Sequence, residues 1–112
     1  MDFRLTDEQQ AFRRAVAKFV DAEIAPVADE LDAKGEFPLA LFRRVGELGY
    51  FGLRYPEEYG GSAADMVTYC LWAEEMARGF MSVAAAACMQ SLMGTHFVFK
   101  YGNEEQRQKY LV

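Results

Sequence analysis

The sequence predicts an all-α fold, a bundle of about five helices. Apolar residues recur three and four positions apart, helix-start signals stand at several points, and no segment shows the alternation of apolar and polar residues that marks a strand. Hydrophobic residues make up 52% of the 112 residues, which is enough for one compact domain with its own core.

The first expected helix begins at Thr6 and ends at Gly35. TDEQ at 6–9 is a capping box, in which Thr6 accepts a hydrogen bond from the amide of Gln9. Pro26 lacks a backbone N–H and would clash with a preceding carbonyl, so we expect a kink there. The apolar stripe of this helix consists of Phe12, Val16, Phe19, Val20, Ile24, Val27 and Leu31.

Two further helices are expected in the middle of the chain. Pro38 is suited to the first turn of the second helix, which ends at Gly49 and buries Leu39, Phe42, Val45 and Leu48. YFGLRYPEEYGGS at 50–62 is rich in Gly, Pro and aromatic residues and should be an ordered loop. Asp65 starts the third helix, whose expected inward face is Met66, Tyr69, Cys70, Ala73 and Met76 or Ala77.

The last part of the chain predicts two more helices. Ser82 is expected to be the N-cap of a fourth helix that runs to Tyr101 and stops at Gly102. NEEQ at 103–106 is another capping box and opens a short fifth helix.

The fourth helix contains a stretch without charge, GFMSVAAAACMQSLMGTHFVF at 79–99, 21 residues in a chain that is 26% charged. Its length would suit a membrane span. However, no basic residues are biased to one flank, and polar residues interrupt it, namely Ser82, Gln90, Ser91, Thr95 and His96. We therefore expect no membrane span, but a buried helix in contact with protein nearly all round.

Alanine and methionine fill this stretch where Leu and Ile would be usual. The alanines at 84–87 leave little side-chain volume, and Met89 and Met93 stand one turn apart with Leu92 between them. Methionine is flexible and adaptable, so this face could line a groove for an apolar ligand. From the residues alone, plain helix packing is the simpler interpretation.

Charge and cysteine content exclude several functions. The net charge is −5 and the longest basic runs are two Arg-Arg pairs, so no nucleic-acid partner is expected. Cys70 and Cys88 lack CxxC spacing and should be reduced and buried. With one histidine, no metal site is expected. The polar N-terminus lacks a signal peptide, which favours a cytoplasmic location.

No catalytic or cofactor-binding residue is expected in this chain. Glu74 and Glu75 suggest general acid–base chemistry, but adjacent helical residues point about 100° apart, so an ion-paired or solvated structural role is favoured. PEEYGG at 56–61 lacks the spacing of a phosphate-binding loop and is interpreted as a structural turn.

Four stretches together resemble one family. AEIAPVADELD at 22–32, FGLRYPEEYGG at 51–61, EEMAR at 74–78 and YGNEEQRQKYL at 101–111 are similar to the N-terminal helical domain of the acyl-CoA dehydrogenases, over nearly the whole chain. The resemblance implies that residues 1–112 are one domain of a larger enzyme. The middle β domain and the C-terminal helical domain of that enzyme are absent from this chain.

The resemblance also implies an activity, the flavin-dependent α,β-dehydrogenation of an acyl-CoA thioester. FAD would be held mainly by the other two domains, and the catalytic Glu would lie beyond this chain. An electron-transfer flavoprotein would accept the electrons. The enzyme would be a homo-oligomer. This chain alone should then be inactive and bind no FAD. Its part would be one wall of the acyl pocket, with Met89, Leu92 and Met93 as the candidate residues.

Two alternatives remain open at this point. One is a domain of a related flavin-dependent monooxygenase or nitroalkane oxidase, and the other is a free-standing helical interaction module.

Overall fold

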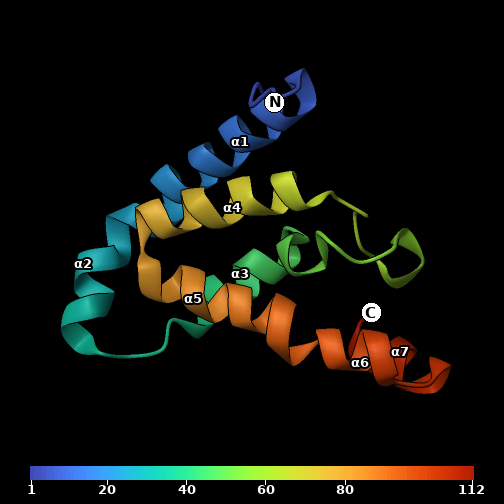
Figure 1. Ribbon diagram of the computed structural model, residues 1–112. Coiled ribbons are helices and arrows are strands. Elements are labelled where there is room, and N and C mark those ends of the chain that lie inside the picture. The colour runs from blue at the N-terminus through green and yellow to red at the C-terminus, as the bar shows by residue number, and fades with distance from the viewer.

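The computed structural model describes all residues from 1 to 112, and it consists of helices and connecting loops without a strand (Figure 1). Two of the α-helices continue through a π-helical turn, so the chain forms five rods, and the predicted all-α fold is confirmed. In chain order the rods are α1 (Asp7–Phe19), a π turn (Val20–Ile24) and α2 (Ala25–Lys34); α3 (Leu39–Glu47); α4 (Met66–Gly79); α5 (Met81–Met89), a π turn (Gln90–Gly94) and α6 (His96–Tyr101); and α7 (Glu104–Tyr110).

The predicted helix caps at three rods are present. Thr6 accepts the Gln9 amide at 3.1 Å, and the Gln9 side chain accepts the Thr6 amide at 2.9 Å. Asn103 and Gln106 form the same reciprocal pair at 2.9 Å in both directions. The Asp65 carboxylate caps α4 by accepting a hydrogen bond from the backbone N–H of Thr68 at 2.7 Å. These local signals work because each satisfies helix-terminal donors that would otherwise lack partners.

The irregularity expected at Pro26 lies just before it. The π turn Val20–Ile24 separates α1 from α2, and Pro26 stands in the first turn of α2. There its missing N–H costs little. The first rod changes direction at this point, and α2 turns away from the line of α1 (Figure 1).

The prediction that Ser82 caps the fourth helix is wrong. The N-cap position of α5 is Phe80, and no side chain forms a cap hydrogen bond there. Phe80 is extended, with φ −163° and ψ 108°, and it alone joins α4 to α5. Because the chain turns within one residue, Ser82 already lies inside the first turn of α5.

The core lies where α4 packs between the first rod and α5 (Figure 1). Trp72 is fully buried and stands beside the rings of Tyr50 and Tyr69, with ring centroids 6.0 and 5.3 Å away. At the end of α4, a Cβ on Gly79 would overlap the side chain of Val20, so the glycine permits the close crossing of these two rods. The other buried residues of this core cluster are Val16, Phe19, Ile24, Val45, Leu53, Met76, Val83, Ala84 and Ala87.

The inward face of α4 differs from the prediction. Met66 and Cys70 are exposed, and Cys88 on α5 is only partly buried, so the expected burial of both thiols is wrong. The helix contacts neighbours on two sides, which widens its buried face and centres it on Trp72. The buried residues of α4 are Tyr69, Leu71, Trp72, Glu75 and Met76.

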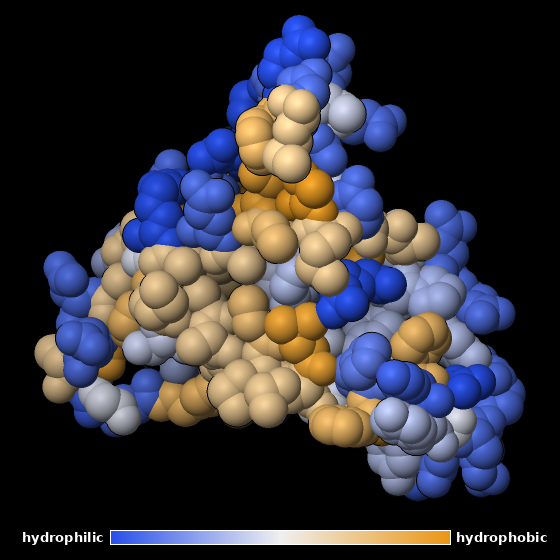
Figure 2. Space-filling model, in the orientation of Figure 1, coloured by the Kyte–Doolittle hydropathy of each residue, from blue (hydrophilic) through white to orange (hydrophobic).

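The fourth rod is not surrounded by protein, contrary to expectation. Its inner side packs on α4 through small residues, whereas its outer side is open. Only 22% of the most apolar 18-residue stretch within Met81–Tyr101 is buried. By length and composition alone Met81–Tyr101 could cross a membrane. Figure 2 shows a broad apolar area over α4 and α5. Such an area marks an interaction surface. The large apolar residues that are more than half exposed on this rod are Met81, Met89, Met93, Phe97 and Tyr101.

Candidate functional site

An open apolar groove of about 540 Å³ runs along the fourth rod, and we call it the methionine groove. One side is formed by α5, the π turn and α6, and the other by Phe37, which lies just before α3, and Phe42 of α3. No lining residue carries a charge. The lining consists of Phe37, Phe42, Ala86, Met89, Gln90, Met93, Gly94 and Phe97.

Helical spacing brings the wall of this groove together. Ala86, Met89, Met93 and Phe97 follow one another at three- and four-residue intervals, which places them on one face. Ala86 contributes little volume and leaves space beside the two methionines.

Aromatic rings form the opposite wall. The centroids of Phe37 and Phe42 are 5.3 Å apart with an interplanar angle of 59°, and Phe51 stands behind Phe42 at 4.7 Å. These are the tilted geometries that aromatic pairs prefer, so the wall is held in place by its own packing.

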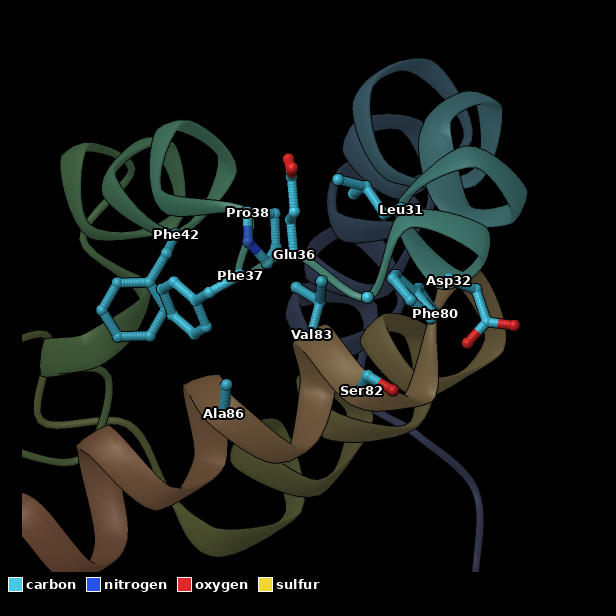
Figure 3. Close-up of a pocket in the computed structure, with 11 residues that line it drawn as sticks. Leu31, Asp32, Glu36, Phe37, Pro38, Phe42, Phe80, Ser82, Val83 and Ala86 are labelled. Carbon is cyan, nitrogen blue, oxygen red and sulfur yellow. The ribbon is translucent and has the colours of Figure 1, made fainter.

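A second cavity of about 330 Å³ adjoins the groove and shares Phe37, Phe42 and Ala86 with it. Figure 3 shows Val83 and Ala86 of α5 on one side of this cavity, with Pro38 and the two phenylalanines across from them. Two acidic residues, Asp32 and Glu36, also line it, and their carboxylates point away from Val83 and Ala86 (Figure 3).

The structure brings together two of the three predicted site residues. Met89 and Met93 both line the groove, whereas Leu92, which is 37% exposed, is not part of its lining. The sequence interpretation missed Phe37 and Phe97, and it assigned Phe42 to helix packing alone. Periodicity showed that Phe42 lies on an apolar face, but it does not show which rod that face meets.

Glu75 has the structural role that was predicted. Its carboxylate accepts from Arg13 Nε at 3.1 Å and from Arg78 Nε at 2.7 Å, which ties α4 to α1. The hydrogen bond from Arg78, together with that from Arg13, holds the pKa of Glu75 below its usual value. Glu74 is more distant, with Arg13 Nη2 at 3.4 Å, and its side chain is 65% exposed.

The groove carries no charge and the rod beside it exposes large apolar residues, so this face of the domain is suited to contact with other apolar surfaces. The acyl-CoA dehydrogenase N-terminal domain profile matches residues 6–112. The chain therefore belongs to the acyl-CoA dehydrogenase family, and the resemblance seen in the sequence is confirmed.

Known proteins of this kind are similar along almost the whole chain. Benzylmalonyl-CoA dehydrogenase of Aromatoleum aromaticum is 53% identical over 105 residues, which cover 94% of this chain and 28% of that protein. The structure of butyryl-CoA dehydrogenase from Megasphaera elsdenii matches with a TM-score of 0.90 and 33% identity over 99% of this chain and 30% of its own.

A third match is a structure described as an electron transferring flavoprotein of Acidaminococcus fermentans. It has a TM-score of 0.93 and 33% identity, over 99% of this chain and 29% of its own. The chain thus spans less than a third of the length of the proteins it matches.

Proposed function

We propose that this chain is the N-terminal domain of a flavin-dependent acyl-CoA dehydrogenase, in which the methionine groove forms one wall of the acyl pocket. The observation that carries the proposal is the meeting of Met89 and Met93 in an uncharged groove beside an exposed apolar rod. An acyl chain is apolar, and a wall of this kind binds and orients it and excludes water. Leu92 would lie at the edge of this site.

FAD, when bound to the whole enzyme, supplies the acceptor for the hydride that leaves the β-carbon. The groove lining offers no cationic side chain for a diphosphate, so its residues do not fit this cofactor. We assign the cofactor, and the Glu that takes the α-proton, to the other domains. Alone, this chain should be inactive and bind no FAD.

Within the same proposal, the acyl group is aromatic. Three phenylalanines line the groove with the two methionines, and both aromatic pairs and sulfur–aromatic contacts favour a ring there. The relative that is 53% identical is named for benzylmalonyl-CoA, which carries an aromatic ring.

The partners and the location belong to the same proposal. The enzyme passes its electrons to an electron-transfer flavoprotein, which the match to a structure described by that name supports. The exposed fourth rod packs against other domains of the same subunit, and the subunits form a homo-oligomer. Two free cysteines suit a reducing compartment such as the cytoplasm.

The test is Met89→Trp in the full-length enzyme that contains this chain. We would measure kcat/KM for butanoyl-CoA and for 3-phenylpropanoyl-CoA, together with the melting temperature. Filling the groove should lower kcat/KM for 3-phenylpropanoyl-CoA relative to kcat/KM for butanoyl-CoA by about tenfold or more. Butanoyl-CoA should still be oxidised. Met81→Trp is the matched control, because Met81 is an exposed methionine on the same rod that does not line the groove.

Three results would count against the proposal. A lowered melting temperature with unchanged substrate preference would place Met89 in ordinary packing. Electron transfer to oxygen in place of a flavoprotein would favour the monooxygenase or nitroalkane oxidase alternative. A reading frame that stops near Val112, without a catalytic Glu, would favour the free-standing interaction module.

A further inference from the structure

Behind the methionine groove, the inner side of the same rod carries a cluster of hydroxyl groups. Tyr55 comes from the loop between α3 and α4, Tyr69 from α4, and Ser91 and Thr95 from the π turn and its end. Tyr55, Tyr69 and Ser91 are buried. Buried hydroxyls need partners, and these four residues supply partners to one another and to the backbone of the turn.

Two backbone carbonyl groups of the π turn accept hydrogen bonds from outside the helix ladder. The Tyr55 hydroxyl donates to the carbonyl oxygen of Ser91 at 2.6 Å. Thr95 Oγ1 lies 2.9 Å from the Tyr55 hydroxyl and donates to the carbonyl oxygen of Gln90 at 3.0 Å. A π turn is rare and short in proteins. The hydrogen bonds from the Tyr55 and Thr95 side chains to these carbonyl groups stabilise the turn relative to a regular α-helix.

Tyr69 holds the turn from a second direction. Its hydroxyl lies 2.7 Å from Ser91 Oγ, and Ser91 Oγ donates to the carbonyl oxygen of Cys88 at 3.3 Å. In the Tyr69–Ser91 pair either hydroxyl can be the donor, and in both cases the pair links α4 to the π turn. Burial raises the pKa of Tyr69 to about 12, so this hydroxyl keeps its proton at neutral pH.

The outer side of the same turn faces the groove. Gln90, Met93 and Gly94 line the groove, and Met89 immediately precedes the turn. Met89 and Met93 lie one turn apart on a single rod, so a change in this turn moves one relative to the other. Tyr55 does not itself line the groove.

We infer that Tyr55 is a positioning residue: by holding the Ser91 carbonyl it sets the π turn, and thereby the places of Met89 and Met93 and the size of acyl group that the groove accepts. The effect on substrate choice rests on the proposed function. The effect on the turn rests on the hydrogen bonds alone.

Tyr59 provides a matched control. Both tyrosines come from the same loop, both are 7% exposed, and both rings contact Phe99 edge-on, at 5.3 Å for Tyr55 and 6.2 Å for Tyr59. The Tyr59 hydroxyl donates to Glu104 of α7 at 2.9 Å, away from the π turn. Tyr55→Phe and Tyr59→Phe therefore each remove one hydroxyl, and they differ in the segment that is released.

The experiment uses the full-length enzyme and two measurements. The first is the ratio of kcat/KM for 3-phenylpropanoyl-CoA to that for butanoyl-CoA, and the second is amide hydrogen exchange at residues 90–96. Tyr55→Phe should shift the ratio by about threefold to tenfold and speed the exchange at 90–96. Tyr59→Phe should leave both unchanged.

Several outcomes would overturn the inference. Unchanged exchange at 90–96 in Tyr55→Phe would show that Tyr55 does not hold the turn. Faster exchange in Tyr55→Phe with an unchanged kcat/KM ratio would show that Tyr55 does not affect substrate selectivity. Equal shifts of the ratio in Tyr55→Phe and Tyr59→Phe would show the same. A wild-type enzyme that oxidises neither thioester would refute the proposed function instead, and the exchange result would still decide whether Tyr55 sets the turn.

Discussion

Replacing Glu75 by Gln should destabilise the domain much more than the same change at Glu74. The Glu75 side chain is 7% exposed and accepts from Arg13 at 3.1 Å and from Arg78 at 2.7 Å. Hydrogen bonds to a charged group contribute about 1.5–3 kcal/mol. Both arginines are partly solvated, at 42% and 48% exposure. We therefore expect a loss of about 2 kcal/mol, because water recovers part of each interaction.

Glu74 supplies the comparison within the same helix turn. It is 65% exposed and meets Arg13 at 3.4 Å, so Glu74→Gln should cost about 0–1 kcal/mol. The free energy of unfolding of the 1–112 chain can be obtained for both variants from urea titrations followed by circular dichroism. Equal losses in the two variants, or no loss at Glu75, would refute the reasoning from burial and geometry.

The same pair predicts a pH dependence. The pKa of Glu75 is lowered in the folded chain, by Arg78 first and Arg13 second. Its contribution to stability is therefore fully present above the unfolded pKa of about 4.3 and is lost as the pH falls through the lower folded value. The wild-type chain and Glu75→Gln should differ most near neutral pH and converge in acid. A difference that grows as the pH falls would contradict this.

Two further predictions concern the loop and the thiols. A Cβ on Gly61 would overlap the backbone of Tyr55, whereas one on Gly60 meets no atom within 4 Å at a φ of +80°. Gly60→Ala should thus lower the free energy of unfolding by about 1–2 kcal/mol, and Gly61→Ala should lower it distinctly more. Urea unfolding measures both losses, and the reverse order would contradict the loop geometry. Cys70 is exposed and Cys88 partly buried, so native thiol titration should label Cys70 first, and faster labelling of Cys88 would count against this placement.

The start and end of most helices could be predicted from the sequence, because capping is a local matter. Thr6 and Gln9, like Asn103 and Gln106, need only three-residue spacing to satisfy the free amides of a first turn. Gly35 ends the first rod for an equally local reason, a left-handed conformation with a φ of +65°. The family resemblance also rests on such local stretches.

The failures at Ser82 and Cys70 have a different origin. Ser82 is a good capping residue by type, but the sharp connection at Phe80 puts it inside the helix. Cys70 lies on the apolar stripe of α4 by spacing, but the helix packs between two neighbours and its buried face is centred on Trp72. The buried face of α4 depends on contacts with other rods, and the start of α5 depends on how α4 and α5 meet at Phe80. The spacing of apolar residues along the chain does not record either.

For the candidate site, the sequence by itself determined that Met89 and Met93 share one face of a long, uncharged helix. Only the tertiary structure decided what lies opposite them, because Phe37 is brought there by the packing of α3 against α5, across a separation of about fifty residues in the chain. The same holds for Tyr55, whose hydrogen bond to Ser91 joins residues 36 positions apart. Helical periodicity is a property of neighbours along the chain, whereas a groove is formed by two rods whose mutual placement depends on how the whole core packs.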